Sequence, residues 1–320
     1  MSNDQRELHV VFGAGPVGLT VADELLARGR HVRVVNRSGP PVGPPNDSQI
    51  EWASADAMNT AATIEAGAGA AVIYFALNPP YDKWPELFPP MQANVLQAAQ
   101  DAGARLVAME NVYMYGPTGG APLTEALPAA ATTKKGRVRA AMHDDLMAAH
   151  TRGEVAVTVG RASDFVGPRV LESAIGERVV PAVIAGKKAQ VLGDPDLPHT
   201  YTYMPDIGRA LVTLGERDEA LGETWHIPSG DTVTTRGYVQ LLADAAGTGT
   251  ARLQVAPKLL LRALGLINAP VRETIEMLYE FEEPFILDHS KYAAAFGDNA
   301  TPLAEAASAT VQWYRDQASA

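Results

Sequence analysis

The sequence predicts an α/β protein in which a doubly wound parallel sheet forms the core and a smaller lobe follows toward the C-terminus. In the first half, short β-branched runs alternate with Ala-rich segments of helical period, a pattern typical of parallel βαβ units. The strand-like runs are apolar on both faces, as expected of a sheet covered by helices on both sides. After Gly167-Pro168 the alternation becomes less regular and Pro and Gly are more frequent, which indicates the second lobe.

The individual elements follow from hydrophobic periodicity and from helix start and stop signals. Strands are expected at residues 8–13, 31–37, 50–55, 71–77, 105–111 and 155–163. Helices are expected between them at 16–28, 59–66, 88–102 and 135–150. A later helix at 204–216 and a strand at 224–228 are expected to return to the sheet. The acidic stretch 272–285 is expected to form an amphipathic helix with a solvated face and an apolar underside.

Domain boundaries follow from the same reading. The predicted core comprises residues 1–167 with returning segments at about 201–228, and the predicted substrate lobe comprises about 168–200 and 229–320. A chain of 320 residues that is 47% hydrophobic is long enough for a sizeable core of this kind.

Composition also excludes several classes of protein. A net charge of −11 and a pI near 5.1 leave no extended basic surface for nucleic acid or anionic lipid. The absence of cysteine excludes disulfides and thiolate metal sites, and the scattered histidines predict no structural zinc. Because the N-terminus is polar and no apolar run is long enough for a membrane span, we expect a soluble, cytoplasmic protein with a small-molecule substrate.

A glycine pattern marks the strongest candidate site. Gly13, Gly15 and Gly18 form G-x-G-x-x-G directly after the first strand, and Pro16 and Val17 open the helix that follows. In such a turn the first glycine permits the bend, the second lets the backbone approach a pyrophosphate, and the third allows close helix–strand packing. The anion would lie at the helix N-terminus, whose N–H groups and dipole favour negative charge. The motif therefore predicts a Rossmann-like core that binds a dinucleotide.

The end of the second strand bears on the choice of dinucleotide. NAD sites usually place Asp or Glu there, whereas this chain has Asn36 and Arg37. Without a carboxylate, a 2′-phosphate is not repelled, and a guanidinium can bind it in forked geometry. NADP(H) is therefore favoured over NAD(H). The alternative is that Arg37 simply faces solvent.

Several motifs together resemble the extended short-chain dehydrogenase/reductases, the NAD-dependent epimerase/dehydratase family. They are "GAGPVG", Asp56 after the third strand, "FALNPP", "VYMYGP", "GRASDFVGP", "MPDIGRAL" and "TPLAEAASATVQWYR", and they span essentially the whole chain. The resemblance implies that Asp56 lies near the adenine and that Ala76, Leu77 and Asn78 line the cofactor. It also implies a C-terminal lobe that closes a substrate cleft, and it allows a homodimer.

The catalytic positions depart from those of the family. Its members carry Ser or Thr four residues before the Tyr of "YG", and then Tyr-x-x-x-Lys on the following helix. By the same resemblance, the corresponding residues here are Asn111, Lys135 and Arg139. Asn111 could donate a hydrogen bond to a developing oxyanion, Lys135 could transfer a proton, and Arg139 would place positive charge near the nicotinamide ribose.

Other residues compete for the missing tyrosine's role. Tyr113 shares a face with Asn111 and Tyr115 if that segment stays extended, so its hydroxyl is a second candidate proton carrier. The alternative for Tyr113 and for Tyr115 is packing beneath the substrate lobe. For the cations "KKGRVR", the alternative is a solvated helix start, with Lys134 and Arg137 facing water.

Candidate substrate contacts lie on predicted loops. Tyr81 and Trp84 follow the fourth strand, and Asp164 follows the sixth. By the resemblance, His199 lies where the family's substrate lobe often meets the cleft. Tyr115 is a further candidate for contact with substrate. Each has a structural alternative: a packed aromatic loop for Tyr81 and Trp84, turn formation for Asp164, and a structural or exposed ring for His199.

The predicted function is an NADP(H)-dependent oxidoreductase that acts on a carbonyl or alcohol of a small polar or nucleotide-linked substrate. Loss of the family tyrosine leaves open a protein that binds NADP(H) without redox turnover and acts as a sensor or regulator. A third alternative is an epimerase or dehydratase that retains its cofactor.

Overall fold

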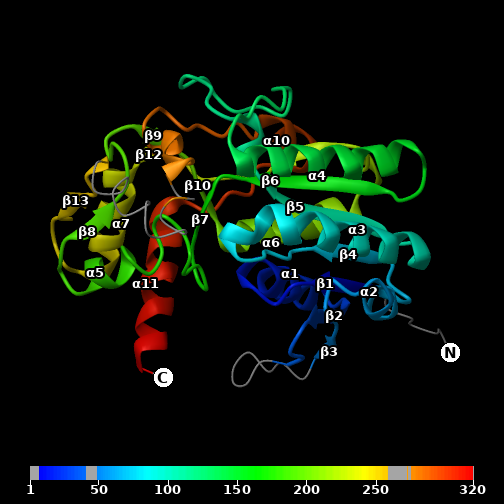
Figure 1. Cartoon of the computed structure of the whole chain (residues 1–320). Helices are drawn as coiled ribbons and strands as arrows, with labels where there is room; N and C mark the ends of the chain where they lie inside the picture. The colour runs from blue at the N-terminus through cyan, green and yellow to red at the C-terminus, as the bar shows by residue number, and fades with distance from the viewer. Residues whose placement is uncertain (1–6, 41–48, 259–271, 273–274, 320) are drawn as a thin grey trace. The chain divides into compact units, whose positions relative to one another are not determined.

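The computed structural model describes residues 7–40, 49–258, 272 and 275–319 (Figure 1). The chain forms two compact units, which are considered separately. Unit 1 comprises Met1–Glu110, Val138–Arg161 and Ile207–Trp225, and unit 2 comprises Asn111–Arg137, Ala162–Asp206 and His226–Ala320. The segments 111–137 and 162–167 were expected in the core but group with unit 2, as do 201–206 and 226–228.

Unit 1 is built around a seven-stranded sheet with the order β11-β6-β5-β4-β1-β2-β3. Neighbouring strands from β5 to β3 run parallel, as predicted. The chain adds strands on one side of β1 and then on the other, so the order reverses between β1 and β4. The strands are β1 Leu8–Phe12, β2 His31–Asn36, β3 Ile50–Ser54, β4 Val72–Phe75, β5 Arg105–Asn111, β6 Val157–Ala162 and β11 Thr224–His226.

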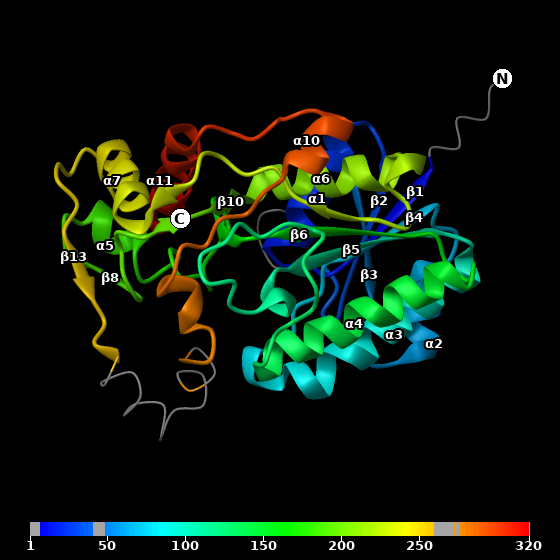
Figure 2. The same ribbon diagram turned by 90° about the horizontal axis from the view of Figure 1, so that it is seen from above.

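Helices cover both faces of this sheet. In Figure 2, α1 and α6 lie on one side of the strands, and α2, α3 and α4 lie on the other. Because both faces are covered, β4 is buried at every position and carries apolar and aromatic side chains throughout. The bounds are α1 Pro16–Ala27, α2 Thr60–Gly67, α3 Trp84–Ala102, α4 Lys134–Thr151 and α6 Met204–Glu216, with short 3-10 helices η1 Tyr81–Lys83 and η3 Asp218–Ala220.

The α3 helix begins earlier than expected. The expected start was residue 88, yet the helix begins at Trp84, with Pro85 in its first turn where a missing N–H breaks no bond. Pro89 and Pro90 lie inside the helix and are tolerated there. At the other end Gly103 adopts the left-handed conformation typical of a helix C-cap, as its φ of 64° shows.

Unit 2 packs helices against short strand pairs around a core of its own. The buried cluster includes Val179, Val183, Tyr201, Tyr238 and Val311, which come from α5, β10, α7, α11 and the chain before α5. The helices are α5 Val180–Ile184, α7 Thr235–Ala246, α10 Ser290–Phe296 and α11 Leu303–Ser319, with 3-10 helices η2 Tyr113–Tyr115 and η4 Leu278–Phe281. The strands are β7 Asp164–Val166, β8 Ala189–Val191, β9 Pro198–His199, β10 Tyr201–Tyr203, β12 Val233–Thr234 and β13 Leu253–Val255, paired as β10-β7, β12-β9 and β13-β8.

The acidic stretch 272–285 is not the solvated amphipathic helix that was expected. Residues 273–274 lie outside the described residues, and the described remainder contains the 3-10 helix η4. Leu278, Glu280 and Phe281 of that helix are all buried. The packing of Leu278 and Phe281 agrees with the expected apolar underside, but the buried Glu280 does not fit a solvated acidic face.

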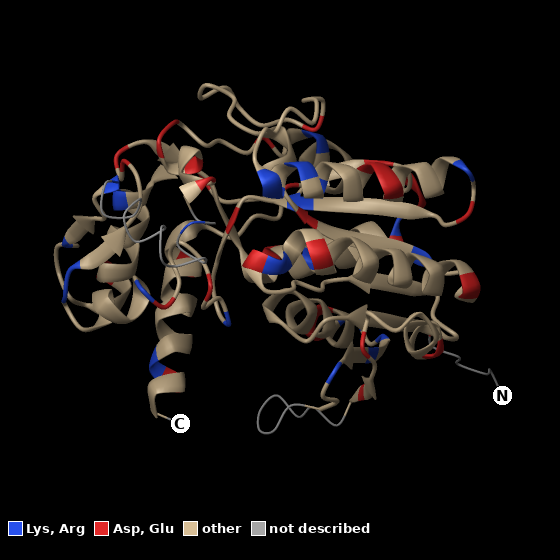
Figure 3. Ribbon diagram, viewed as in Figure 1, with Lys and Arg blue, Asp and Glu red and all other residues tan. Residues whose placement is uncertain are grey.

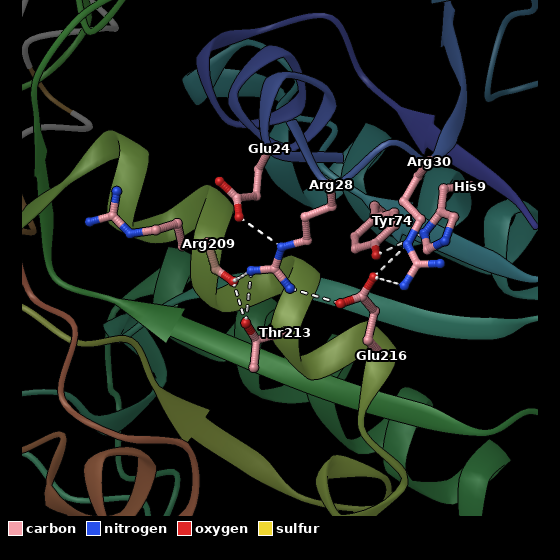
Figure 4. Close-up of polar contacts among 8 residues, drawn as sticks. All are labelled: His9, Glu24, Arg28, Arg30, Tyr74, Arg209, Thr213 and Glu216. Atoms are coloured by element: carbon pink, nitrogen blue, oxygen red, sulfur yellow. Dashed lines mark hydrogen bonds and ion pairs between the residues drawn. The ribbon is translucent and has the colours of Figure 1, made fainter. Parts of the chain in front are cut away.

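A polar network joins α1 to α6 in unit 1 (Figure 4). The carboxylate of Glu216 pairs with Arg28 at 2.8 Å and with Arg30 at 2.6 Å. Beside it, His9 Nδ1 lies 3.1 Å from the Tyr74 hydroxyl, and the rings stack. Because His9 Nε2 is buried without a hydrogen-bond partner, protonation of this imidazole would bury a charge.

No helix in the described part of the chain is both long and apolar enough to span a membrane.

The buried imidazole of His9 predicts a pH-dependent stability. Burial lowers the pKa of His9 from 6.5 to about 4, and Arg30 acts in the same direction. The unfolded chain therefore binds the extra proton first, so the stability contributed by neutral His9 is complete above pH 6.5 and is lost as the pH falls toward 4. The loss is about 3 kcal/mol at most.

Thermal or urea unfolding between pH 4 and 7.5 measures this effect. His9→Phe should be less stable at neutral pH, because Tyr74 loses its partner, but should show a weaker loss between pH 6.5 and 4. His31→Gln, at the exposed start of β2, should follow the parent curve. Equal slopes for the parent and His9→Phe would contradict the assignment.

Candidate functional site

The predicted cofactor residues gather at the carboxyl ends of the strands in unit 1. Gly13 follows β1, Asn36 ends β2, Asp56 follows β3 and Ala76 follows β4. In open α/β sheets ligands bind at this edge, in the crevice where the strand order reverses. Here the reversal lies between β1 and β4, next to the glycine turn.

The three glycines have different surroundings, which match the three roles predicted for them. Gly13 has a φ of 118°, and a Cβ atom there would lie 2.5 Å from Ala76 O. A Cβ on Gly18 would collide with the carbonyl oxygen of Gly13. A Cβ on Gly15 would meet nothing within 4 Å. The turn is thus tight at its first and third glycines and open at its second, which is the fit that a pyrophosphate requires.

Gly15 also precedes a helix that can receive an anion. It is the N-cap of α1, with Pro16 in the first turn and no side chain capping the helix. Gly15 and Pro16 are exposed and Val17 is half-buried, so the first backbone N–H groups of α1 face the open side of the turn. These groups and the helix dipole suit a phosphate.

The adenosine end of the predicted site has one buried acceptor and one exposed cation. Asn36 Oδ1 is buried without a hydrogen-bond partner, so it can accept from a ligand hydroxyl or amino group. The Arg37 side chain is exposed, while its backbone oxygen accepts a bond from Ser54 Oγ at 2.9 Å. Asp56 is exposed as well, and its Oδ1 accepts from Met58 N at 3.0 Å.

Leu77 and Asn78 continue from Ala76 after β4. Ala76 and Leu77 are half-buried and Asn78 is exposed. The backbone N–H of Ala76 donates to Phe12 O at 2.9 Å, which fixes this segment beside the glycine turn. Their contact with a cofactor stays a prediction.

A buried charge cluster lies at the same ends of β5 and β6. Glu110 Oε2 accepts from Arg161 Nε at 2.9 Å and lies 3.4 Å from His143 Nδ1. Glu110 and Arg161 are each 2% exposed. Burial opposes ionisation of Glu110, but Arg161, His143 and Arg139 outweigh it and lower the pKa of the carboxyl to about 2. Glu110 and His143 were not predicted as site residues. The signal in the sequence was Glu110 itself, a charged residue within an otherwise largely apolar strand.

Arg139 is part of this interior and not of a solvated helix face. It is 2% exposed, donates from Nη2 to Met109 O at 3.0 Å, and its guanidinium carbon lies 4.8 Å from the centroid of the Phe88 ring. The interpretation of the cation cluster as wholly solvated is therefore wrong for this residue.

Tyr81 and Trp84 belong to an aromatic row that ends at Phe88. Trp84 is 4% exposed, stacks on Phe88 at 5.1 Å and donates from Nε1 to Pro79 O at 3.2 Å. Tyr81 is half-buried and meets Trp84 edge to face. The structure thus gives Trp84 a packing role, and a contact of either residue with substrate stays a prediction.

In unit 2, the segment 111–137 holds three of the four predicted catalytic residues, namely Asn111, Tyr113 and Lys135. Asn111 Oδ1 accepts from Tyr113 N at 3.3 Å, so its NH₂ group is the donor that Asn111 can offer a ligand. Tyr113 lies in η2 and not in an extended segment, so the alternating face assumed from sequence does not apply. A Cβ on Gly136 would lie 2.6 Å from Tyr113 O, so glycine lets the first turn of α4 pack against η2. Lys135 lies directly before Gly136 in this turn of α4.

Lys135 is buried in spite of its position at the start of a helix. It is 1% exposed, and its Nζ lies 3.3 Å from Glu276 Oε1. Lys134 and Arg137 are exposed, as predicted. Figure 3 shows the basic residues gathered at the beginning of α4, with acidic residues further along the helix. The cations of this cluster are therefore divided between the surface and the interior.

Tyr115 forms a buried pair with a histidine. Its hydroxyl lies 2.8 Å from His226 Nε2, and His226 Nδ1 lies 2.8 Å from Asp288 O. Because a carbonyl oxygen only accepts, a neutral His226 carries its proton on Nδ1, and Tyr115 donates to Nε2. The packing alternative thus describes Tyr115, which is 2% exposed, and its contact with substrate stays a prediction.

Asp164 and His199, which were predicted separately, form a pair in unit 2. His199 Nε2 lies 2.8 Å from Asp164 Oδ2, and the imidazole stacks on the rings of Phe281 and Phe285. The histidine is buried, while the Asp164 side chain is 18% exposed. Burial raises the pKa of the Glu280 carboxyl well above its usual range, and the negative charge of Asp164 adds to this. Asp164 is the member of this group that a ligand can reach.

A separate hollow in unit 2 has a volume of about 460 Å³. It is lined by Gly193, Asp194, Pro195, Val255, Ala256, Pro257, Lys258, Leu278 and Glu282. None of the predicted catalytic or substrate residues is among them. Across the described ranges, no group of three or more His, Asp or Glu side chains is arranged to hold a metal ion.

Residues 9–227 match the NAD dependent epimerase/dehydratase family, so the chain belongs to that family. The resemblance inferred from motifs is confirmed. Among solved structures, the chain is similar to UDP-glucuronic acid 4-epimerase from Bacillus cereus in complex with NAD, at 16% identity and a TM-score of 0.75, with 97% of this chain and 99% of that chain covered.

Two further solved structures show the same fold. One is DesIV, a dTDP-glucose 4,6-dehydratase from Streptomyces venezuelae with NAD and TYD bound, at 20% identity, a TM-score of 0.77 and 98% coverage of both chains. The other is the Bordetella bronchiseptica enzyme WbmH in complex with NAD+, at 18% identity, a TM-score of 0.75, and coverage of 97% of this chain and 98% of that chain. No curated protein sequence matches this chain.

Two substitutions in the glycine turn distinguish an effect on cofactor binding from an effect on the stability of the fold. Gly15→Ala places a methyl group in open space, so the variant should unfold at nearly the parent temperature but bind NADP(H) and NAD(H) at least about tenfold more weakly, or about 1.4 kcal/mol. Gly18→Ala should instead lose stability, because its methyl group collides with Gly13 O.

Calorimetric titration and thermal unfolding of both variants separate the two effects. Unchanged binding by Gly15→Ala would mean that no pyrophosphate approaches the turn.

Proposed function

We propose that this protein is a nicotinamide-dinucleotide-dependent oxidoreductase that acts on a carbonyl or alcohol of a small polar or nucleotide-linked substrate. The observation that carries the proposal is the burial of Lys135, which is 1% exposed at the start of α4, where Gly136 packs against Tyr113 O. Membership of the family and the open turn at Gly15 support the cofactor.

The residues of this chain can perform the proton chemistry of such a reaction. Bound nicotinamide supplies or accepts a hydride. In reduction, the Asn111 NH₂ group donates a hydrogen bond to the substrate oxygen and stabilises the negative charge that develops there. Lys135 Nζ gives a proton to the same oxygen and regains one from solvent. An ammonium is a donor only, so it suits the oxygen of a carbonyl. Tyr113 is the alternative donor.

We further propose NADP(H) as the preferred cofactor. Arg37 is exposed at the end of β2, and Asn36 replaces the carboxylate that would repel a 2′-phosphate. Solved relatives hold NAD, and Asn36 Oδ1 could accept from a ribose hydroxyl, so the preference depends on Arg37.

The family and its solved members favour a second candidate, an epimerase or dehydratase that oxidises and then re-reduces its substrate with a retained cofactor. Such an enzyme would purify with nucleotide attached and would show no net consumption of added cofactor. The absorbance spectrum of the purified protein distinguishes it from an oxidoreductase that exchanges cofactor. A protein that binds cofactor but turns over no substrate would fit the sensor alternative.

Replacement of Lys135 tests the reaction. Lys135→Met should reduce turnover at least about 100-fold, because the proton donor is lost. Its dissociation constant for NADPH should stay within about threefold of the parent value, because the change lies outside the glycine turn. Steady-state kinetics with a panel of ketones and aldehydes, and fluorescence titration with NADPH, measure the two quantities.

The exposed neighbour provides the control for this variant. Lys134→Met should keep turnover within about twofold of the parent. Unchanged turnover in Lys135→Met would remove this lysine from the mechanism, and Tyr113→Phe would then test the alternative donor.

Replacement of Arg37 tests the cofactor preference. Arg37→Ala should weaken NADPH binding at least about tenfold, because the 2′-phosphate loses its guanidinium, and should leave NADH binding within about threefold. Arg217→Ala removes another exposed arginine of unit 1 and should affect neither cofactor. Equal affinity of the parent for NADPH and NADH, with no change in Arg37→Ala, would assign Arg37 to solvent and favour NAD(H).

A further inference from the structure

The carboxylate of Glu276 lies at the first turn of α4 and contacts it through three hydrogen-bond donors. Its Oε2 accepts from Lys134 N at 3.2 Å, and its Oε1 accepts from Lys135 N at 3.2 Å. The same Oε1 lies 3.3 Å from Lys135 Nζ. Glu276 comes from a segment far away in sequence, before η4, and both partners belong to unit 2.

The Glu276 carboxylate caps the start of α4 and also neutralises the charge of the Lys135 ammonium. The first N–H groups of an α-helix have no partner within the helix, and the positive end of the helix dipole favours a carboxylate. Lys135 is 1% exposed and Glu276 is 26% exposed, so the ammonium is buried while its counter-ion stays partly hydrated. A buried charge of this kind is strongly destabilised when its partner is removed.

The shared oxygen also constrains where the ammonium can lie. Because Oε1 contacts both the backbone N–H and the Nζ of Lys135, the side chain must turn back toward its own helix start. The Lys135 side chain is already enclosed, and its ammonium is a compact charge, so the contact with the carboxylate adds an electrostatic restraint to the packing of the stem. The contact therefore selects one group of orientations before any substrate binds.

We propose that Glu276 is the positioning residue for Lys135. It holds the ammonium in the orientation from which a proton is transferred, and it acts through Lys135 without touching the substrate. This inference rests on the proposed function, and it adds a residue from the C-terminal part of the chain to the catalytic arrangement. Pre-organisation of this kind accelerates a reaction because the donor does not have to be ordered during the chemical step.

Glu283 offers a matched control in the same part of the chain. Its Oε1 accepts from Thr118 N at 3.0 Å, so it also bonds a backbone N–H of the segment 111–137. The bond of Glu283 is to Thr118, whereas the bonds of Glu276 are to the first turn of α4, so a loss of anchoring alone should appear equally in both glutamates.

The test compares Glu276→Ala, Glu276→Asp and Glu283→Ala in the full chain, with kcat and KM measured for the best carbonyl substrate. Glu276→Ala should lower kcat at least about tenfold and leave KM for substrate and cofactor within about threefold. Glu276→Asp should recover part of the loss. Added formate should raise kcat of Glu276→Ala, because a free carboxylate can take the vacated place. Glu283→Ala should keep kcat within about twofold.

Two results would overturn the proposal. One is an unchanged kcat in Glu276→Ala. The other is a loss of kcat that follows the loss of thermal stability, is not reversed by formate and is no smaller in Glu276→Asp. A purely structural role gives that result.

A second readout does not require turnover. Acylation by an amine-reactive ester, followed by mass spectrometry, should label Lys135 slowly relative to exposed Lys134 in the parent and faster in Glu276→Ala. If the parent reduces no carbonyl and this difference is found, the proposed function fails while the positioning contact stands. An equal labelling ratio in both proteins overturns the contact itself.

Discussion

The close approach of α1 to the end of β1 is the constraint on which the cofactor site depends. Position 18 has no room for a side chain because the Gly13 carbonyl occupies that space, and position 13 has none because Ala76 O lies there. These two contacts hold the start of α1 at the carboxyl end of the sheet, beside the segment after β4. Gly15 is then the place where the backbone stays open, so tight packing on both sides creates the space for a ligand.

Unit 1 also contains a group of buried charged side chains. Glu110, Arg139, His143 and Arg161 all lie in the interior behind the ends of β5 and β6. The pKa of Glu110 falls to about 2 because neighbouring cations outweigh the effect of burial. The buried arginine at position 139 thus lies in an interior that already carries a compensating carboxylate. In unit 2, Lys135 is matched in the same way by Glu276.

The sequence predicted the regular part of the fold because that part is encoded locally. The strand and helix pattern up to residue 163, the glycine turn and the family were readable from periodicity and motif spacing, and boundaries differ from the structure by a few residues. The start of α3 was placed at residue 88 because the segment before it was interpreted as a loop beside the cofactor. In the stretch 272–285, the buried Leu278 and Phe281 match the expected apolar underside, but the helix η4 there is a 3-10 helix and Glu280 is buried as well.

The sequence by itself therefore determined the fold class and the glycine turn, and it pointed to the candidate catalytic groups Asn111, Lys135 and Arg139. Only the tertiary structure decided which of those groups are buried and what they contact. The pairs Lys135–Glu276, Tyr115–His226 and Asp164–His199 each join segments far apart in the chain. No local pattern records such a pair, because periodicity and propensity describe neighbours along the chain, whereas burial and charge compensation depend on neighbours in space.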